Sequence, residues 1–114
     1  MHEFSIIESL ISTAVGECRR RGFSKVEKIK ILIGKASGVM PEALFFGFDV
    51  LKRDTIAGEA SLVIEEVPVT GYCSNCSSSL ITNEAFIFLC PFCSSTSLVI
   101  NSGRELNIVE IEVI

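Results

Sequence analysis

The sequence predicts an α+β protein in which two helices pack on a three-stranded mixed sheet, with a four-cysteine module inserted before the last strand. Two segments repeat apolar residues with the period of a helix, and three alternate apolar and polar residues as strands do. Four cysteines gather in a nearly uncharged stretch as two C-x-x-C pairs. With 114 residues, 48% of them hydrophobic, the chain can build one modest core and an appendage.

The first predicted helix covers residues 5–21. Apolar residues recur on one face at alternating steps of three and four. This face consists of Phe4, Ile7, Leu10, Ile11, Ala14, Val15 and Cys18. Ser5 and Glu8 have the spacing of a capping box, and three arginines before Gly22 suit the negative end of a helix and an αL cap. We expect Cys18, the odd thiol, to belong to the core.

The remaining elements follow in order. Lysine and isoleucine alternate over residues 25–33, which predicts a strand with one buried face that ends at Gly34. Pro41 suits the first position of a second helix, which we expect to stop near Arg53. Its buried face is predicted to consist of Leu44, Phe45, Phe48 and Leu51. Further strands are predicted over residues 61–67 and 105–114, where apolar and polar side chains alternate.

A change of composition marks the cysteine module. Between Val67 and Gly103 the only charged residue is Glu84, and serines are dense around the cysteines. This change predicts a separate zinc-binding module over residues 69–102. Residues 1–68 and 103–114 are then expected to form one discontinuous α/β domain, to which the chain returns for its last strand.

The spacing of Cys73, Cys76, Cys90 and Cys93 is that of two knuckles facing one tetrahedral ion. We interpret the segment as a zinc-ribbon-like module, because about thirty residues cannot bury enough apolar area to fold alone, whereas structural zinc supplies on the order of 10 kcal/mol. Iron is an alternative, since the second knuckle looks like that of a rubredoxin. Disulfides are a further alternative, which a reducing compartment disfavours. A thioredoxin-type redox pair is another, but such a site uses one C-x-x-C at a helix N-terminus and not two facing pairs.

The net charge of −4 limits the partners. It would fall to about −6 with four thiolates around one divalent ion, and this field repels nucleic-acid phosphates and anionic membranes. We therefore expect neither nucleic-acid nor membrane binding. The alternative function is a zinc-ribbon module that binds protein or nucleic acid. We do not expect an enzyme, because the sequence offers no Ser/His/Asp set and a four-cysteine site has no open zinc position.

The segment Met1-His2-Glu3 contains the chain's single histidine. One interpretation is a frayed terminus. The other is a metal site, because the Met1 amine, the His2 amide and imidazole and the Glu3 amide could surround one cation, and planar nitrogen sites suit Ni(II) or Cu(II). Such binding should weaken as the imidazole protonates near about pH 6. The acidic Glu3 also argues against a secretory leader, so we expect a cytoplasmic protein.

Several segments together resemble the hydrogenase nickel-incorporation protein HypA (HybF) family, and they do so over the whole chain. The resemblance rests on Met1-His2-Glu3, Ile31-Leu32-Ile33-Gly34, Ser37-Gly38-Val39, Pro41-Glu42-Ala43-Leu44 and the two C-x-x-C knuckles, which occur in this order. One position departs from the family's pattern. Relatives commonly place an acidic residue where this chain has Met40, so the loop carboxylate that could approach nickel is missing. Met40 could instead pack or serve as a soft auxiliary ligand.

The resemblance implies a small metallochaperone with two metal sites. It implies that His2 is the essential Ni(II) ligand, completed by the Met1 amine and the backbone at Glu3. The four cysteines are implied to hold Zn(II) as a structural or sensing site. The implied partners are the maturation GTPase HypB and the machinery that assembles the large subunit of [NiFe]-hydrogenase, and some members of the family also serve urease. We expect a monomer or a weak homodimer.

Overall fold

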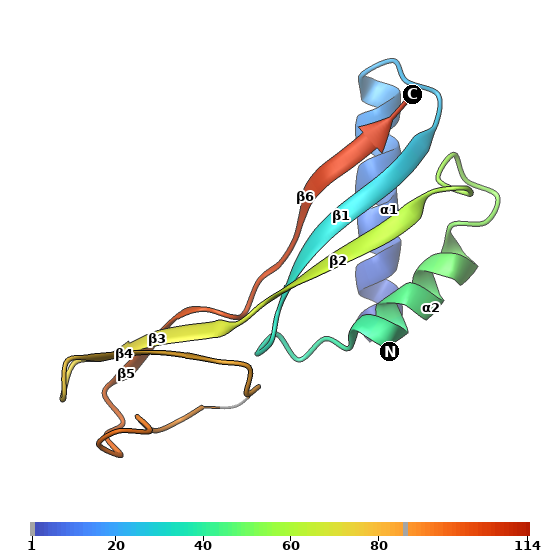
Figure 1. Ribbon diagram of the computed structural model, residues 1–114. Helices are drawn as coiled ribbons and strands as arrows, with labels where there is room; N and C mark the ends of the chain where they lie inside the picture. The colour runs from blue at the N-terminus through green and yellow to red at the C-terminus, as the bar shows by residue number, and fades with distance from the viewer. Residues whose placement is uncertain (1, 86) are drawn as a thin grey trace. The chain divides into compact units, whose positions relative to one another are not determined.

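The computed structural model describes residues 2–85 and 87–114, with the backbone alone at His2. The described residues form two helices and six strands, in two three-stranded sheets (Figure 1). The elements are α1 (His2–Arg20), β1 (Val26–Gly34), α2 (Pro41–Leu51), β2 (Ser61–Val67), β3 (Val69–Cys73), β4 (Ser78–Thr82), β5 (Leu98–Ser102) and β6 (Leu106–Val113). The predicted α+β class is confirmed. Neither helix, over the residues described, has the length and apolar composition needed to cross a membrane.

The chain divides into two compact units. The first consists of Met1–Ile31, Val39–Glu65 and Asn107–Ile114, and the second consists of Leu32–Gly38 and Glu66–Leu106. Both helices thus belong to the first unit, and the four cysteines belong to the second. The boundaries that we expect for a nickel-binding domain and a zinc module remain a prediction, because compactness does not say which part binds which metal.

Helix α1 buries the face that the sequence predicts. Its residues Ile7, Ile11, Ala14 and Cys18 are buried. The core position of Cys18 is therefore confirmed. The helix ends in a Schellman motif, in which the Gly22 N–H donates to the Arg19 carbonyl and the Phe23 N–H donates to the Cys18 carbonyl, both at 3.0 Å. Gly22 has φ +82°, so the predicted αL cap is confirmed as well.

The start of α1 differs from the prediction. We expected Ser5 and Glu8 to form a capping box, but the helix begins at His2, so Ser5 lies in its first turn. The physical reason is a contact with α2, because Phe4 packs over Gly47. A capping bond contributes about 1 kcal/mol, and burying part of an aromatic ring is worth at least as much.

Helix α2 begins at Pro41 as predicted and ends at Leu51, two residues before the expected stop. Leu44 and Phe48 are buried, but Phe45 is 43% exposed, so its predicted core position is wrong. Gly47 lies in the buried face instead. The helical repeat of α2 was therefore predicted correctly, but the side of the helix that is buried was not. A glycine adds nothing to a hydrophobic pattern, although it lets another helix approach closely.

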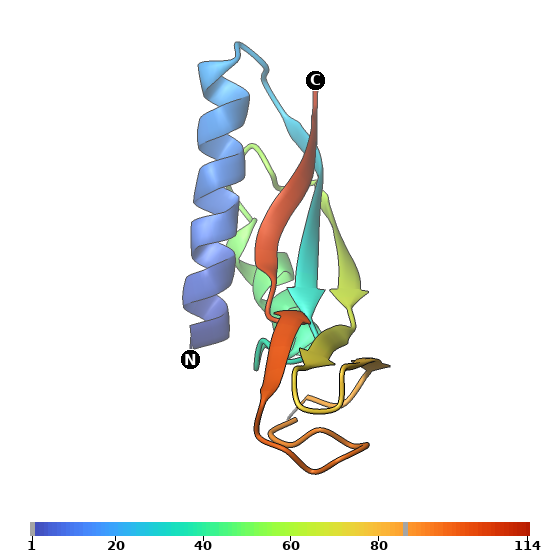
Figure 2. The ribbon, with the colours of Figure 1, turned by 90° about the vertical axis from the view of Figure 1, so that its left-hand side faces the viewer.

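The sheet β2-β1-β6 is mixed, as predicted, and both helices lie on one of its faces (Figure 2). Strand β6 runs antiparallel to β1, because the N–H of Ser24 donates to the carbonyl of Ile114 and the N–H of Gly34 donates to that of Glu105. The isoleucines of β1 lie on the buried face of the strand. Those at positions 29, 31 and 33 are buried, together with Val26.

Strand β2 runs parallel to β1. The Val26 N–H donates to the carbonyl of Ile56 at 3.0 Å, and the Lys35 N–H donates to that of Val67 at 2.8 Å. Helix α2 supplies the crossover that parallel strands require. The opposite face of this sheet carries ion pairs. Lys28 Nζ lies 3.0 Å from Glu110 and 2.8 Å from Glu112, and Lys30 Nζ lies 3.2 Å from Glu65.

The second sheet, β4-β3-β5, is antiparallel and is built wholly within the cysteine segment. Strand β3 lies in the centre, with Tyr72 opposite Ser79 on one side and Val99 on the other. The pairing with β5 is irregular between Thr70 and Gly71. The sequence predicted a zinc-ribbon-like module here but not these three strands, because serines and cysteines interrupt the alternation of apolar residues.

Candidate metal centre

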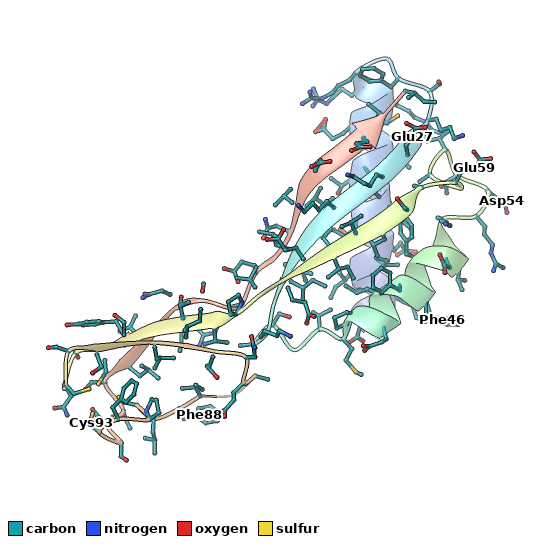
Figure 3. All side chains as sticks on the ribbon, viewed as in Figure 1. Glu27, Phe46, Asp54, Glu59, Phe88 and Cys93 are labelled. Carbon is teal, nitrogen blue, oxygen red and sulfur yellow. The ribbon has the colours of Figure 1, made fainter. Side chains whose placement is uncertain are left out.

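Four thiols from two separate turns meet in the second unit. The Sγ atoms of Cys73 and Cys93 are 3.7 Å apart, as are those of Cys76 and Cys90. All four sulfur atoms lie within 4.8 Å of one another. Cys73 ends β3, Cys76 follows in the turn before β4, and the other two lie in the loop before β5, where Figure 3 labels Cys93. The structure thus brings together all four cysteines that the sequence singles out.

The spacing of the sulfur atoms fits one tetrahedral ion. Zinc–sulfur bonds of about 2.3 Å give sulfur–sulfur separations of about 3.8 Å in a regular tetrahedron. The two separations of 3.7 Å are close to this value. Four thiolates are a ligand set of structural zinc, and they leave no corner for water or substrate. The residues present therefore suit an ion that is held and not one that activates a reactant.

Each knuckle ends on a serine in the left-handed region. Ser77 has φ +57° and Ser94 has φ +62°, and each directly follows the second cysteine of its pair. In the second knuckle, the Ser94 N–H donates to the Cys90 carbonyl at 2.8 Å, which closes the turn. Sequence reasoning missed these serines. The signal was the dipeptide Cys-Ser at the end of both knuckles.

Asn75 orients and tunes one of the thiols. Its side-chain Nδ2 donates to the Sγ of Cys93 at 3.4 Å. This bond, followed by one from the backbone N–H of Ser95, lowers the pKa of Cys93 to about 6. Asn75 comes from the first knuckle and Cys93 from the second, so the contact also ties the two turns together. Sequence reasoning did not identify this residue.

The other thiols respond differently to their surroundings. Burial raises the pKa of Cys90 to about 11. The backbone N–H of Phe92, which donates to the Cys90 sulfur at 3.4 Å, acts in the opposite direction and lowers this pKa, but its effect is smaller. A hydrogen bond with the Ser78 side chain lowers the pKa of Cys76. A divalent cation among these groups would favour the thiolate at every position, because its charge exceeds all these local effects.

The predicted nickel ligands fall largely outside the described residues. Met1 and the side chain of His2 are not described, and Glu3 lies in the first turn of α1. The set of Met1, His2 and Glu3 therefore remains a prediction. Met40, in contrast, is described. It is the N-cap residue of α2 and its side chain is 59% exposed, so the packing role that we considered for it is not supported.

The fold and the sulfur cluster define a class of protein, a small metal-binding protein whose four-cysteine site is closed to substrates. Comparison with known proteins assigns the family. The chain belongs to the HypA family, whose model, described as "Hydrogenase/urease nickel incorporation, metallochaperone, hypA", matches residues 1–113. The chain is thus a metallochaperone of this family and not an enzyme.

Similar proteins are found over nearly the whole chain. The hydrogenase maturation factor HypA of a Picosynechococcus species is 40% identical over 114 residues, which cover 100% of both chains. That of Methylocella silvestris is 40% identical over 113 residues, 99% of each. The solution structure of the Ni metallochaperone HypA from Helicobacter pylori has a TM-score of 0.69 at 23% identity, covering 98% of this chain and 97% of that one. This last likeness concerns the fold alone.

Proposed function

We propose that this chain binds Ni(II) at its N-terminus and delivers it for [NiFe]-hydrogenase maturation, while its four cysteines hold Zn(II) as a structural or sensing site. Family membership supplies the general role of a nickel metallochaperone. The two ligand sets, the metal at each and the delivery step are the proposal. The observation that carries it is the closed sulfur cluster, with all four thiols within 4.8 Å.

A closed four-cysteine cluster suits an ion that stays in the protein, and not an ion that the protein carries and releases. Four thiolates hold zinc tightly, because all its bonds must break before it can leave. A cargo ion has to be released, so it is better bound elsewhere. Ni(II) favours planar nitrogen ligands. The chain's single imidazole is that of His2, and this makes the N-terminal segment the best candidate for the cargo site.

The start of α1 at His2 favours such a site. Planar binding of Ni(II) by backbone nitrogens requires amide protons to be lost. The first N–H groups of a helix precede its first i→i−4 bond, so deprotonation there breaks no bond of the helical ladder. The positive end of the helix dipole also stabilises the negative charge that deprotonation creates. Met1, His2 and the backbone at Glu3 are therefore the ligands that we propose.

The partners that we propose are the maturation GTPase HypB and the machinery that assembles the hydrogenase large subunit, with urease as a second client class. The names of the relatives support a role in hydrogenase maturation, since they are hydrogenase maturation factors. The family description mentions both hydrogenase and urease. We further propose that transfer takes place in the cytoplasm.

Metal content tests the proposal directly. Zinc and nickel per chain are measured at about pH 7.5 and about pH 6, for the parent, for His2→Ala and for Glu8→Ala, a control at an exposed position of α1. The parent should hold one zinc and one labile nickel, with less nickel at the lower pH because the imidazole protonates. His2→Ala should keep zinc and lose nickel. Equal nickel affinity in the parent and His2→Ala would contradict the proposal.

One observation favours a second function, a protein-binding surface on the β4-β3-β5 sheet. Tyr72 and Val99 are paired across β3 and β5, and both are exposed, as is Ile81 on β4. The segment between Val67 and Gly103 contains no lysine or arginine, so nucleic acid is the weaker alternative. Titration with duplex DNA at about 50 and 200 mM salt separates the two, since only phosphate binding would fall steeply with salt.

A further inference from the structure

Phe4 joins the first turn of α1 to α2. Its ring lies directly over Gly47, because a Cβ added at that glycine would be 3.0 Å from Phe4 Cδ1 and 3.1 Å from Cε1. The ring also meets Phe46 edge to face, with 6.1 Å between ring centroids and 61° between planes. Figure 3 labels Phe46 on α2. Phe4 therefore has one contact that a Cβ at position 47 would crowd and another with an aromatic neighbour.

These contacts matter for the stability of the first turn. Ile7 is the first fully buried residue of α1 in the described part of the chain, and it also lies against Gly47, with Cγ2 at 3.4 Å from the added Cβ position. Before Ile7, the ring of Phe4 contacts α2 at Gly47 and Phe46. The first turn of a helix has no i→i−4 bonds to its own N–H groups and frays without tertiary support. Phe4 thus supplies tertiary support to the first turn of α1.

Helical backbone places successive nitrogen atoms close together. With helical ψ the nitrogens of neighbouring residues are about 2.8 Å apart, whereas with the ψ of a strand they are about 3.5 Å apart. A five-membered chelate ring needs the shorter separation, because both nitrogens must reach the same ion. The described backbone is helical from His2 onward, so the amide nitrogens of His2 and Glu3 already have this spacing.

From these contacts we infer that Phe4 is a positioning residue for nickel, and that Gly47, which has no side chain, leaves the space that the Phe4 ring occupies. Phe4 does not touch the ion. It keeps the first turn of α1 helical and so holds the His2 and Glu3 nitrogens at chelating distance before the ion arrives. This inference rests on the proposed N-terminal nickel site and adds the device that preorganises it.

Truncation of the ring provides the test. Ni(II) affinity is measured by competition with a chelator for the full chain loaded with zinc, in the parent, Phe4→Ala and Phe4→Leu. Phe4→Ala should weaken binding roughly tenfold if the helical turn is then populated about one part in ten. Phe4→Leu keeps an apolar contact and should restore most of the affinity. Phe23→Ala is the matched control, since it removes a phenylalanine ring near the other end of α1.

A second variant alters the Phe4–Gly47 contact at the glycine. Gly47→Ala places a methyl group 3.0 Å from Phe4 Cδ1, so the unaltered ring has to move by a few tenths of an ångström. We expect weaker nickel binding in Gly47→Ala and partial recovery in the double variant with Phe4→Leu, whose side chain is narrower. Non-additive effects of this kind mark residues that are in contact. If Phe4→Ala does not fold, the nickel affinity of Gly47→Ala still tests the inference.

Two readouts distinguish positioning from general loss of stability. Zinc content and the denaturant midpoint report the fold, whereas the visible absorption band of planar Ni(II) reports the ligand geometry. Weaker nickel binding with zinc retained supports the inference. Unchanged or tighter binding in both Phe4→Ala and Gly47→Ala overturns it, while loss of nickel in His2→Ala would leave the proposed function intact. If His2→Ala binds nickel as the parent does, the proposed function itself fails.

Discussion

The Sγ atoms of Cys73 and Cys93 lie 3.7 Å apart although the two residues are separated by twenty positions in the sequence. The Cys76–Cys90 contact is equally short and also joins the two knuckles. An ion among these sulfur atoms would therefore cross-link two loops. Cys73 and Cys90 are buried in the second unit, whereas many of its apolar side chains are exposed, so such an ion would add substantially to the contacts that hold these loops.

We expect Cys90→Ser to release the metal and to unfold the loop before β5. A serine hydroxyl is a poor zinc ligand, and structural zinc contributes on the order of 10 kcal/mol to the folding of small modules. Zinc per chain and amide chemical shifts provide the measurement. Thr96→Ala changes an exposed residue of the same loop and should keep the ion. A folded, zinc-free Cys90→Ser protein would show that the loops do not need the metal.

Asn75→Ala should weaken zinc retention without removing a ligand. The asparagine lowers the pKa of Cys93, so its loss raises that pKa, and protons then displace zinc at a higher pH than in the parent. Loss of a group that orients a metal ligand typically costs about 10–100-fold in affinity. Zinc release during an acid titration measures the effect. Asn83→Ala, at an exposed position beyond β4, is the control and should behave as the parent does.

The sequence was sufficient to predict those parts of the site in which the metal chemistry requires ligands at a particular spacing along the chain. Two C-x-x-C pairs predict one sulfur cluster, because a tetrahedral ion imposes its own geometry on whatever chain surrounds it. Asn75 could not be found in this way. Its contact with Cys93 depends on how one knuckle lies beside the other, and no local pattern encodes that arrangement.

The same contrast holds for the helices. The periods of α1 and α2 were evident, and so was the glycine that ends α1. The start at His2 and the exposure of Phe45 were not, because both depend on where Phe4 meets Gly47. A contact between two helices replaces a local cap in one case and shifts the buried face in the other.

A pair of glycine substitutions should have opposite effects on stability. A Cβ at Gly34 would lie 2.1 Å from the carbonyl carbon and oxygen of Gly103, so Gly34→Ala forces two backbones apart and should cost about 3 kcal/mol. Gly16, on α1, has nothing within 4 Å of its Cβ position. Gly16→Ala should stabilise the protein by about 0.5–1 kcal/mol, since alanine is the better helix former. Urea unfolding measures both. A Gly34→Ala protein as stable as the parent would show that this approach is not tight.

Removal of Lys28 should change the response to acid. Its ammonium group donates hydrogen bonds to Glu110 and Glu112, which lowers the pKa of Glu110 and raises that of Lys28. A carboxyl with a lowered folded pKa contributes stability above its unfolded pKa and loses it as the pH falls through the folded value. Lys28→Met should therefore raise the pKa of Glu110 and shift the onset of this acid loss to higher pH. NMR titration of Glu110 measures the shift, with Lys35→Met as a control at a lysine that pairs with Glu66.

Cys18 should resist modification until the helical unit opens. Cys18 is 1% exposed on the buried face of α1, whereas the other four thiols would be bound to metal. A thiol reagent should therefore label Cys18 only at the rate of unfolding, even after a chelator has removed zinc from the cluster. The slowly labelled thiol is identified as Cys18 if its labelling phase is present in the parent and missing in Cys18→Ala. Cys18→Ser should cost more stability than Cys18→Ala, because a buried hydroxyl without a partner costs about 1–3 kcal/mol. Rapid labelling of Cys18 in the zinc-bound protein would mean that α1 opens independently of global unfolding.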